Sequence, residues 1–122
     1  MLERGDQVPH FTVTQTDGSR ANYSDIWQRR NLVLVCVPGG IDFAAGLKAR
    51  ASEVHAHDAV CVITAESIPG LPCPGIVVAD RWGEIYFVTG ASDVAALPSF
   101  DEILDWLRYV AHECPECQGE TR

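Results

Sequence analysis

The sequence predicts an α/β domain with a mixed central β-sheet flanked by helices and an N-terminal β-hairpin. Apolar runs of strand length alternate with longer segments whose apolar residues recur at helical spacing. Their order is a hairpin, then β-α-β, then ββα, which requires both parallel and antiparallel pairing in one sheet. We therefore expect a mixed sheet with helices on both of its faces.

The first predicted unit is the N-terminal hairpin. Residues 11–14 form one arm, in which Phe11 and Val13 alternate with polar residues. Residues 16–19 contain an Asp-Gly turn, and residues 21–23 can pair back as the second arm. We expect Ser24 to cap a short helical turn that follows the hairpin.

The most apolar run, Asn31 to Val37, is the predicted central strand. Six consecutive apolar residues, several of them β-branched, indicate a strand that is buried on both faces. Three residues that favour a chain reversal follow it: Pro38, Gly39 and Gly40. A strand that turns through glycines into a helix usually places a reactive group at the helix N-terminus. No cysteine, serine or lysine occupies that position here.

Two longer segments have the spacing of amphipathic helices. In residues 42–57, Leu47 and Val54 share one face. The last helix opens at Ser99, which forms a capping box with Glu102. Its predicted buried face comprises Ile103, Leu107 and Val110. Between these helices we predict strands at residues 59–64, 76–79 and 84–88, with the last two joined by the turn at residues 80–83.

Length and charge limit the function. We assign residues 1–113 to one domain and residues 114–122 to a C-terminal tail. A formal net charge of −8 disfavours binding to nucleic acid or to an anionic membrane surface. No apolar stretch has the ~20 residues of a membrane span, and no secretory signal is visible. We therefore expect a cytoplasmic protein with reduced thiols.

Several short motifs occur in a fixed order along the chain. They are Gly5-Asp6, Val8-Pro9, Phe11, Val13, Asp17-Gly18, residues 23–26, residues 31–38, Pro74 and the Asp80–Gly83 turn. Over residues 3–113 this order resembles the redoxin branch of the thioredoxin-like superfamily, which is the alkyl hydroperoxide reductase/thiol-specific antioxidant (peroxiredoxin-like) group. The resemblance implies a thioredoxin-like fold with a cis bond before Pro74. It also implies an antioxidant or thiol–disulfide function, with a protein thiol or disulfide partner or a peroxide-type small molecule.

The chain departs from this family at the usual nucleophile. Gly40 and Phe43 take the positions of the thioredoxin-type CxxC cysteines. Asp42 and Ala45 take those of the peroxiredoxin threonine and cysteine. A thiolate performs the chemistry of both groups, so the family's usual active-site cysteine is absent. The structural part of the family's site remains in Pro38, Gly39, Gly40 and Pro74.

Three of the five cysteines lie within the predicted domain. We expect Cys36 and Cys61, which sit in apolar strands, to be small core residues. Cys73 directly precedes Pro74 and, in the resembled fold, faces the N-terminus of the helix at residues 42–57. Cys73 is therefore a candidate catalytic thiol, and an inert loop thiol is the alternative.

The C-terminal Cys114-Pro-Glu-Cys117 motif is the sharpest local signal. It can be a redox dithiol that cycles with a disulfide and needs no cofactor, which would make the protein an oxidoreductase. It can equally hold zinc, with His112 as a third ligand, in a non-catalytic binding or assembly module that links subunits of a homodimer. A helix end that merely carries two thiols is the third reading. A relay from Cys73 to Cys114 within one chain is not expected, because fourteen helical residues at ~1.5 Å each separate the two ends of the last helix.

Overall fold

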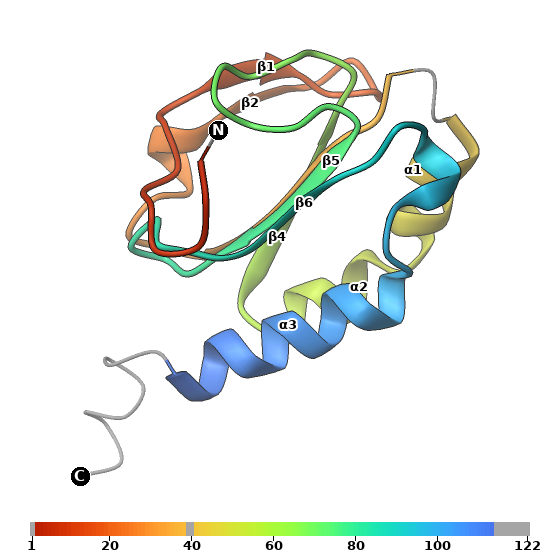
Figure 1. The fold of residues 1–122 in the computed structure, drawn as a ribbon. Helices are drawn as coiled ribbons and strands as arrows, with labels where there is room; N and C mark the ends of the chain where they lie inside the picture. The colour runs from red at the N-terminus through yellow and green to blue at the C-terminus, as the bar shows by residue number, and fades with distance from the viewer. Residues whose placement is uncertain (1, 39–40, 114–122) are drawn as a thin grey trace, which may run out of the picture.

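The computed structural model describes residues 2–38 and 41–113 (Figure 1). The elements follow one another as predicted, except that the predicted helix at residues 42–57 is divided in two and a further short 3-10 turn precedes the last helix. In order they are β1 (Thr12–Thr14), β2 (Arg20–Asn22), η1 (Tyr23–Asp25), β3 (Asn31–Cys36), α1 (Ile41–Ala49), α2 (Ala51–His55), β4 (Ala59–Thr64), β5 (Gly75–Ala79), β6 (Ile85–Gly90), η2 (Val94–Ala96) and α3 (Phe100–Glu113).

The central sheet is mixed, as the sequence predicts. Its strand order is β4-β3-β5-β6. β3 runs parallel to β4 and antiparallel to β5, and β6 pairs antiparallel with β5. The register sets Cys36, at the end of β3, opposite Gly75, at the start of β5. The end of the central strand and the loop that carries Pro74 therefore meet at one rim of the sheet.

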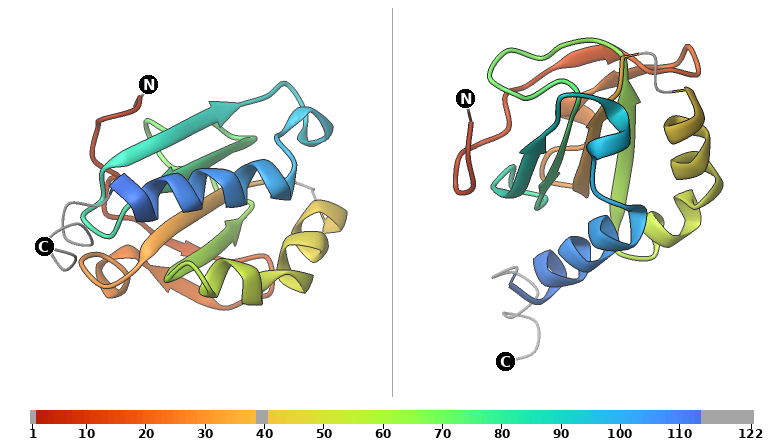
Figure 2. Two further views of the ribbon diagram at one scale, coloured as in Figure 1. Left: turned by 90° about the horizontal axis from the view of Figure 1, so that it is seen from below. Right: turned by 45° about the vertical axis from the view of Figure 1, so that its right-hand side comes forward.

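The two faces of the sheet are covered differently. Side chains of α1, α2 and α3 pack with Val33, Val35 and Val37 on one face. The other face, with Leu32 and Leu34, is covered by the N-terminal hairpin, η1 and the β4–β5 loop. Figure 2 shows the α-helices together on one side of the sheet. The expectation of helices on both faces was wrong, because apolar periodicity reports that a helix is buried but not on which face.

The predicted helix at residues 42–57 is divided in two. Arg50 lies between α1 and α2 with φ −112° and ψ 20°, outside the helical region. Its guanidinium donates to the carboxylates of Glu53 and Asp101 and lies 4.3 Å from the Phe100 ring centroid. The break thus fixes the start of α3 against α2.

Of the two predicted N-cap residues, the one at α3 is confirmed and the one at η1 is wrong. At η1 the cap is Asn22, whose side chain accepts from the Ser24 amide, so the assignment of Ser24 was wrong. At α3 the amide of Glu102 donates to Ser99 Oγ at 3.3 Å, as the capping box predicts. The three residues of the predicted buried face are each 0% exposed: Ile103, Leu107 and Val110.

The hairpin is fastened to the rim of the sheet where β4 ends. Gln15 and Thr64 form an antiparallel bridge, and the Thr16 amide donates to the Ile63 carbonyl at 2.9 Å. On the other side, Lys48 of α1 forms a 2.9 Å ion pair with Asp17 in the hairpin turn. Across the described residues, no helix is long and apolar enough to cross a membrane.

Candidate redox site

A disulfide joins Cys36 to Cys73 at this rim of the sheet. Cys36 is the last residue of β3, and Cys73 lies in the loop that leads into β5. Because Cys36 pairs with Gly75, the residue two places before Gly75 falls within reach, and the two Cα atoms are 5.2 Å apart. That separation lies in the range that an S–S bond requires.

The loop before β5 is held close to its neighbours. The Cys73–Pro74 bond is cis, as the resemblance implied. A Cβ on Gly75 would clash with the Pro72 carbonyl oxygen, and one on Gly90 would lie 2.6 Å from Pro72 Cβ. Glycine at both positions therefore lets Pro72, next to Cys73, lie close to the start of β5 and the end of β6.

The two sulfurs lie in different surroundings. Cys36 is 5% exposed, whereas Cys73 is half-buried. Cys36 Sγ lies 3.2 Å from the carbonyl oxygen of Glu66, in the β4–β5 loop. A nucleophile from solvent therefore reaches Cys73 first, and a Cys36 thiol released by reduction would find an acceptor already in place.

Cys36 is buried, as expected of a small core residue, but it is joined to Cys73 and is not the free thiol that this expectation implied. No local pattern marks a cysteine in an apolar strand as a disulfide partner. The pairing depends on the register between β3 and β5, which brings Cys36 close to a cysteine 37 residues further along the chain. The expectation for Cys61 is met: it is free, packs against the core, and burial raises the pKa of its thiol to about 12. Cys73, the predicted reactive thiol of this region, is the other half of the disulfide.

The structure describes some of the remaining predicted site residues and not others. Pro38 is exposed two residues after the end of β3, at the same rim as Pro74, whereas Gly39 and Gly40 lie outside the described residues. α1 begins at Ile41. His112 lies in the last turn of α3, and Cys114 and Cys117 lie outside the described residues. The proposed roles of that motif therefore stay predictions.

Metal ligands do not gather in the described part of the chain. Within residues 2–38 and 41–113, no group of three or more His, Cys, Asp or Glu side chains could hold a metal ion. The zinc alternative therefore depends on the C-terminal motif alone.

The fold resembles that of known redox proteins. No protein-family model and no curated protein matches the sequence. Among solved structures, AhpC of Mycobacterium tuberculosis is similar at 13% identity and a TM-score of 0.68, covering 100% of this chain and 99% of that one. The reduced 2-Cys peroxiredoxin of Plasmodium vivax is similar at 14% identity and a TM-score of 0.66, covering 89% and 82%. The peroxidoxin BcpB of M. tuberculosis reaches 17% identity and a TM-score of 0.61, covering 90% and 99%.

Further similar structures carry thioredoxin and protein disulfide isomerase names. Identities this low speak for the fold rather than for a shared activity. The chain has the thioredoxin-like fold.

Proposed function

We propose that this protein is a thiol–disulfide oxidoreductase whose reacting bond joins Cys36 and Cys73. One observation carries the proposal: the disulfide lies at the rim of the sheet where the central strand ends, and one of its two cysteines, Cys73, is only half-buried. The similarity to peroxiredoxin and thioredoxin structures supports a redox role of this kind. The site differs from the one expected of the family, because neither cysteine lies in the turn between β3 and α1 or at the start of α1.

The difference in exposure assigns a role to each sulfur. A partner thiolate attacks the half-buried Cys73 Sγ, the S–S bond breaks, and Cys36 leaves as a thiolate that takes up a proton. The Cys36 thiol can then donate to the Glu66 carbonyl oxygen, 3.2 Å away in the oxidised form. A second partner thiol attacks the mixed disulfide and releases Cys73. Overall two partner thiols become one disulfide while Cys36 and Cys73 are reduced.

The compartment predicted from the sequence favours cycling over a permanent cross-link. Disulfides in reducing compartments are usually transient and catalytic or redox-sensing. A protein that works in the cytoplasm and carries the Cys36–Cys73 bond would therefore use it in redox chemistry.

Redox titration with thiol trapping tests the proposal. The protein is equilibrated in glutathione buffers of graded potential, trapped with a maleimide, and the Cys36–Cys73 peptides are quantified by mass spectrometry. We expect one reversible two-electron transition between roughly −300 and −150 mV. A Cys114→Ser, Cys117→Ser variant keeps the second pair out of the measurement. A disulfide that stays oxidised in the folded protein under excess dithiothreitol would instead be structural, and would contradict the proposal.

The C-terminal pair is a second proposed centre. As a redox pair, Cys114 and Cys117 would cycle with protein thiol or disulfide partners, or pass electrons to a peroxide-type small molecule. As a zinc site they would join two subunits, with His112 as a further ligand. Metal analysis of protein purified without added zinc, together with thiol titration, separates these two alternatives.

A further inference from the structure

The outer edge of β1 is paired along only part of its length. The Tyr23 amide donates to the Phe11 carbonyl at 2.9 Å, and the Gln15 amide donates to Ser19 at 2.7 Å. In an antiparallel pair such residues alternate with ones whose backbone groups point away from the partner strand. The N–H and C=O of Thr12 and Thr14 therefore point away from β2.

Thr14 uses both of its outward groups, and Thr12 uses neither. The Thr14 amide donates to the Glu66 carboxylate at 2.5 Å, and Thr64 Oγ1 donates to the Thr14 carbonyl at 2.9 Å. The backbone N–H and C=O of Thr12 have no hydrogen-bond partner within the described residues. The hydrogen bonds along the outer edge of β1 therefore reach Thr14 but not Thr12, the first residue of the strand.

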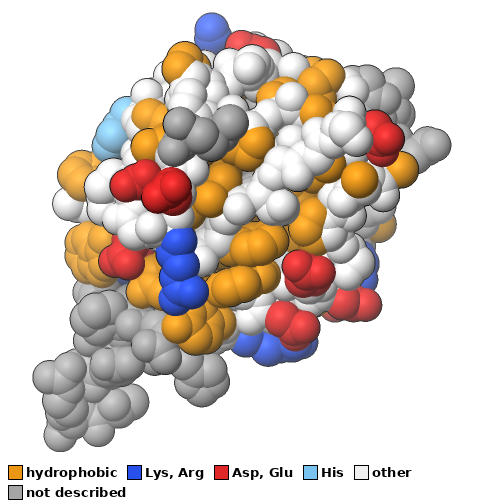
Figure 3. Space-filling view, viewed as in Figure 1, with side chains coloured by type: hydrophobic (Ala, Val, Ile, Leu, Met, Phe, Trp, Pro, Cys, Tyr) orange, Lys and Arg blue, Asp and Glu red, His pale blue; other side chains and the backbone are white. Residues whose placement is uncertain are grey.

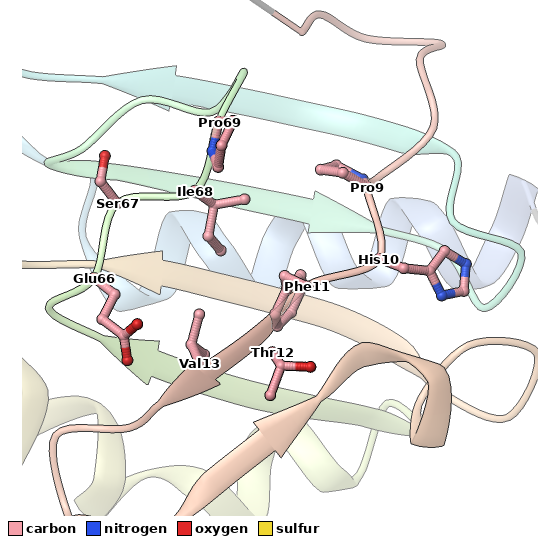
Figure 4. Close-up of a pocket in the computed structure, with 9 residues that line it drawn as sticks. All are labelled: Pro9, His10, Phe11, Thr12, Val13, Glu66, Ser67, Ile68 and Pro69. Carbon is pink, nitrogen blue, oxygen red and sulfur yellow. The ribbon is translucent and has the colours of Figure 1, made fainter.

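A groove opens where this pairing stops. On the N-terminal side of Thr14, a groove of about 300 Å³ lies between residues 9–13 and residues 66–69 of the β4–β5 loop. Buried side chains of Phe11, Val13 and Ile68 form its floor. Figure 4 shows Glu66 at one end of the groove and His10 at the other. The groove therefore joins an apolar floor to a free strand edge.

We propose that this groove binds an extended, positively charged segment of a partner polypeptide, which adds as a strand to the edge of β1. The segment would pair with the N–H and C=O of Thr12 and place alternate side chains on the apolar floor. The volume of the groove suits a short stretch of chain, not a folded domain.

Charge determines which segment fits. Glu66 accepts a hydrogen bond from the Thr14 amide through Oε2. Its other carboxylate oxygen, Oε1, can accept from a lysine or arginine of the segment. The formal net charge of −8 attracts a basic partner as well. A second copy of this chain would bring the same negative charge to the edge, so self-pairing is disfavoured.

The inference does not rest on the proposed redox function, because the free donor and acceptor belong to β1. The two sites are nevertheless neighbours: the Glu66 residue that bounds the groove also places its carbonyl oxygen against Cys36 Sγ. A bound segment would lie directly beside the loop that covers the disulfide.

Three synthetic decapeptides test the proposal. The first alternates threonine and valine between lysine pairs, the second has glutamate in place of lysine, and the third is the first with alternate backbone amides N-methylated. Binding is followed by fluorescence anisotropy and by amide NMR shifts of the full chain. We expect the lysine peptide to bind and to shift Thr12 and Ser67, and the other two to bind at least about tenfold more weakly.

Variants locate the binding site. Thr12→Pro removes the outward N–H without removing a hydrogen bond to β2, and should weaken binding of the lysine peptide about tenfold. Arg20→Pro is the matched control, because it removes an outward N–H from the opposite edge of the hairpin. Glu66→Gln keeps an acceptor for Thr14 and should reduce the preference for lysine over glutamate.

Several outcomes would overturn the inference. They are equal binding of the N-methylated peptide, shifts that map away from Thr12, no binding of the lysine peptide, or an unchanged charge preference in Glu66→Gln. Self-association abolished by Thr12→Pro, measured by sedimentation equilibrium, would show that a second copy is the occupant instead. A result of either kind leaves the redox titration of Cys36–Cys73 unaffected, so the two proposals fail separately.

Discussion

At the scale of single residues, the Cys36–Cys73 bond joins a strand end to a loop across 37 positions of sequence. A cross-link of that span removes conformational freedom from the unfolded chain, which stabilises the folded state by about 3–4 kcal/mol on a chain-entropy estimate. The bond therefore contributes a large part of the stability of a domain of this size, whatever its chemistry.

We predict that Cys36→Ala, Cys73→Ala lowers the free energy of unfolding by about that amount, ~3–4 kcal/mol, in urea titrations of oxidised protein. Reduced wild-type protein should match the variant. Cys61→Ala is the control, because it removes a thiol without breaking a cross-link and should cost about 1 kcal/mol or less. Equal stability of oxidised wild type and double variant would show that the cross-link restricts nothing in the unfolded chain.

A second residue, Asp80, is a buried carboxylate at the turn into β6. Asp80 is 2% exposed, and its Oδ1 accepts from the amides of Trp82 and Glu84, each at 2.9 Å. Burial raises the pKa of the Asp80 carboxyl, although these backbone donors and Arg81 lower it in part. The folded state therefore binds the Asp80 proton more tightly than the unfolded state does. This contribution makes the protein more stable as the pH falls through the raised pKa towards the ordinary value of 3.8.

We predict that Asp80→Asn is at least as stable as wild type at neutral pH, because the amide oxygen keeps both acceptor roles without a buried charge. Asp80→Ala should lose about 1–3 kcal/mol, since the Trp82 and Glu84 amides then lack their shared acceptor in the turn. Urea titrations at several pH values check both, with Asp93→Asn, at the exposed cap of η2, as the control. A marked loss of stability in Asp80→Asn would mean that the charge itself stabilises the turn.

Residue-level signals in the sequence predict the cis bond before Pro74 and the free thiol of Cys61 packed against the core, but not the disulfide. Pro74 belongs to a motif of the resembled family, so the resemblance predicts its cis bond. The pairing of Cys36 depends on the register between β3 and β5, which no local pattern contains. The outward groups of Thr12 are invisible for the same reason.

At the scale of elements, the strands and the last helix are predictable, because burial makes apolar residues recur at the spacing of each type of element. The predicted strand at residues 59–64 coincides with β4, and the capping signal at Ser99 places the start of α3 correctly. The break at Arg50 is not predictable, because apolar spacing continues through it from Leu47 to Val54. At the break, Arg50 forms an ion pair with Asp101 of α3, a contact with a distant element that no local pattern contains.

We predict that Ser99→Ala lowers the free energy of unfolding by about 1 kcal/mol, because the amide of Glu102 then loses its acceptor at the start of α3. α3 carries three fully buried residues of the core, so its first turn cannot fray without disturbing the packing. Ser92→Ala, at an exposed serine outside the helices and strands, is the matched control. Thermal and urea unfolding measure the difference, and equal loss in both variants would exclude a capping role.

At the scale of the whole molecule, the rim with the disulfide and the end of α3 lie far apart. Tyr109, near the end of α3, packs against Tyr86 near the start of β6, with ring centroids 5.9 Å apart. Gly75, beside Cys73, pairs instead with Gly90 at the other end of β6. The 14 residues of α3 span roughly 21 Å at ~1.5 Å per residue.

Charge acts on the same scale. The net charge of −8 gives a field that repels anions over the whole surface. On the face shown in Figure 3, hydrophobic side chains gather near the centre and basic side chains stand apart from one another. A macromolecular partner with positive charge or apolar surface is therefore favoured over an anionic one, which agrees with the basic segment proposed for the groove.

The distance between the disulfide and the described end of α3 leads to the last prediction. Direct exchange between Cys73 and Cys114 within one chain would need the sulfurs to meet, and the last described turn of α3 lies at the rim opposite Cys73. We expect Cys114→Ser, Cys117→Ser to leave the midpoint potential of the Cys36–Cys73 bond unchanged in dilute protein. Zinc removal by a chelator should likewise leave it unchanged, even if the C-terminal pair binds the metal. A concentration-dependent shift would indicate exchange between subunits, whereas a shift independent of concentration would show that α3 opens far enough for the two pairs to react.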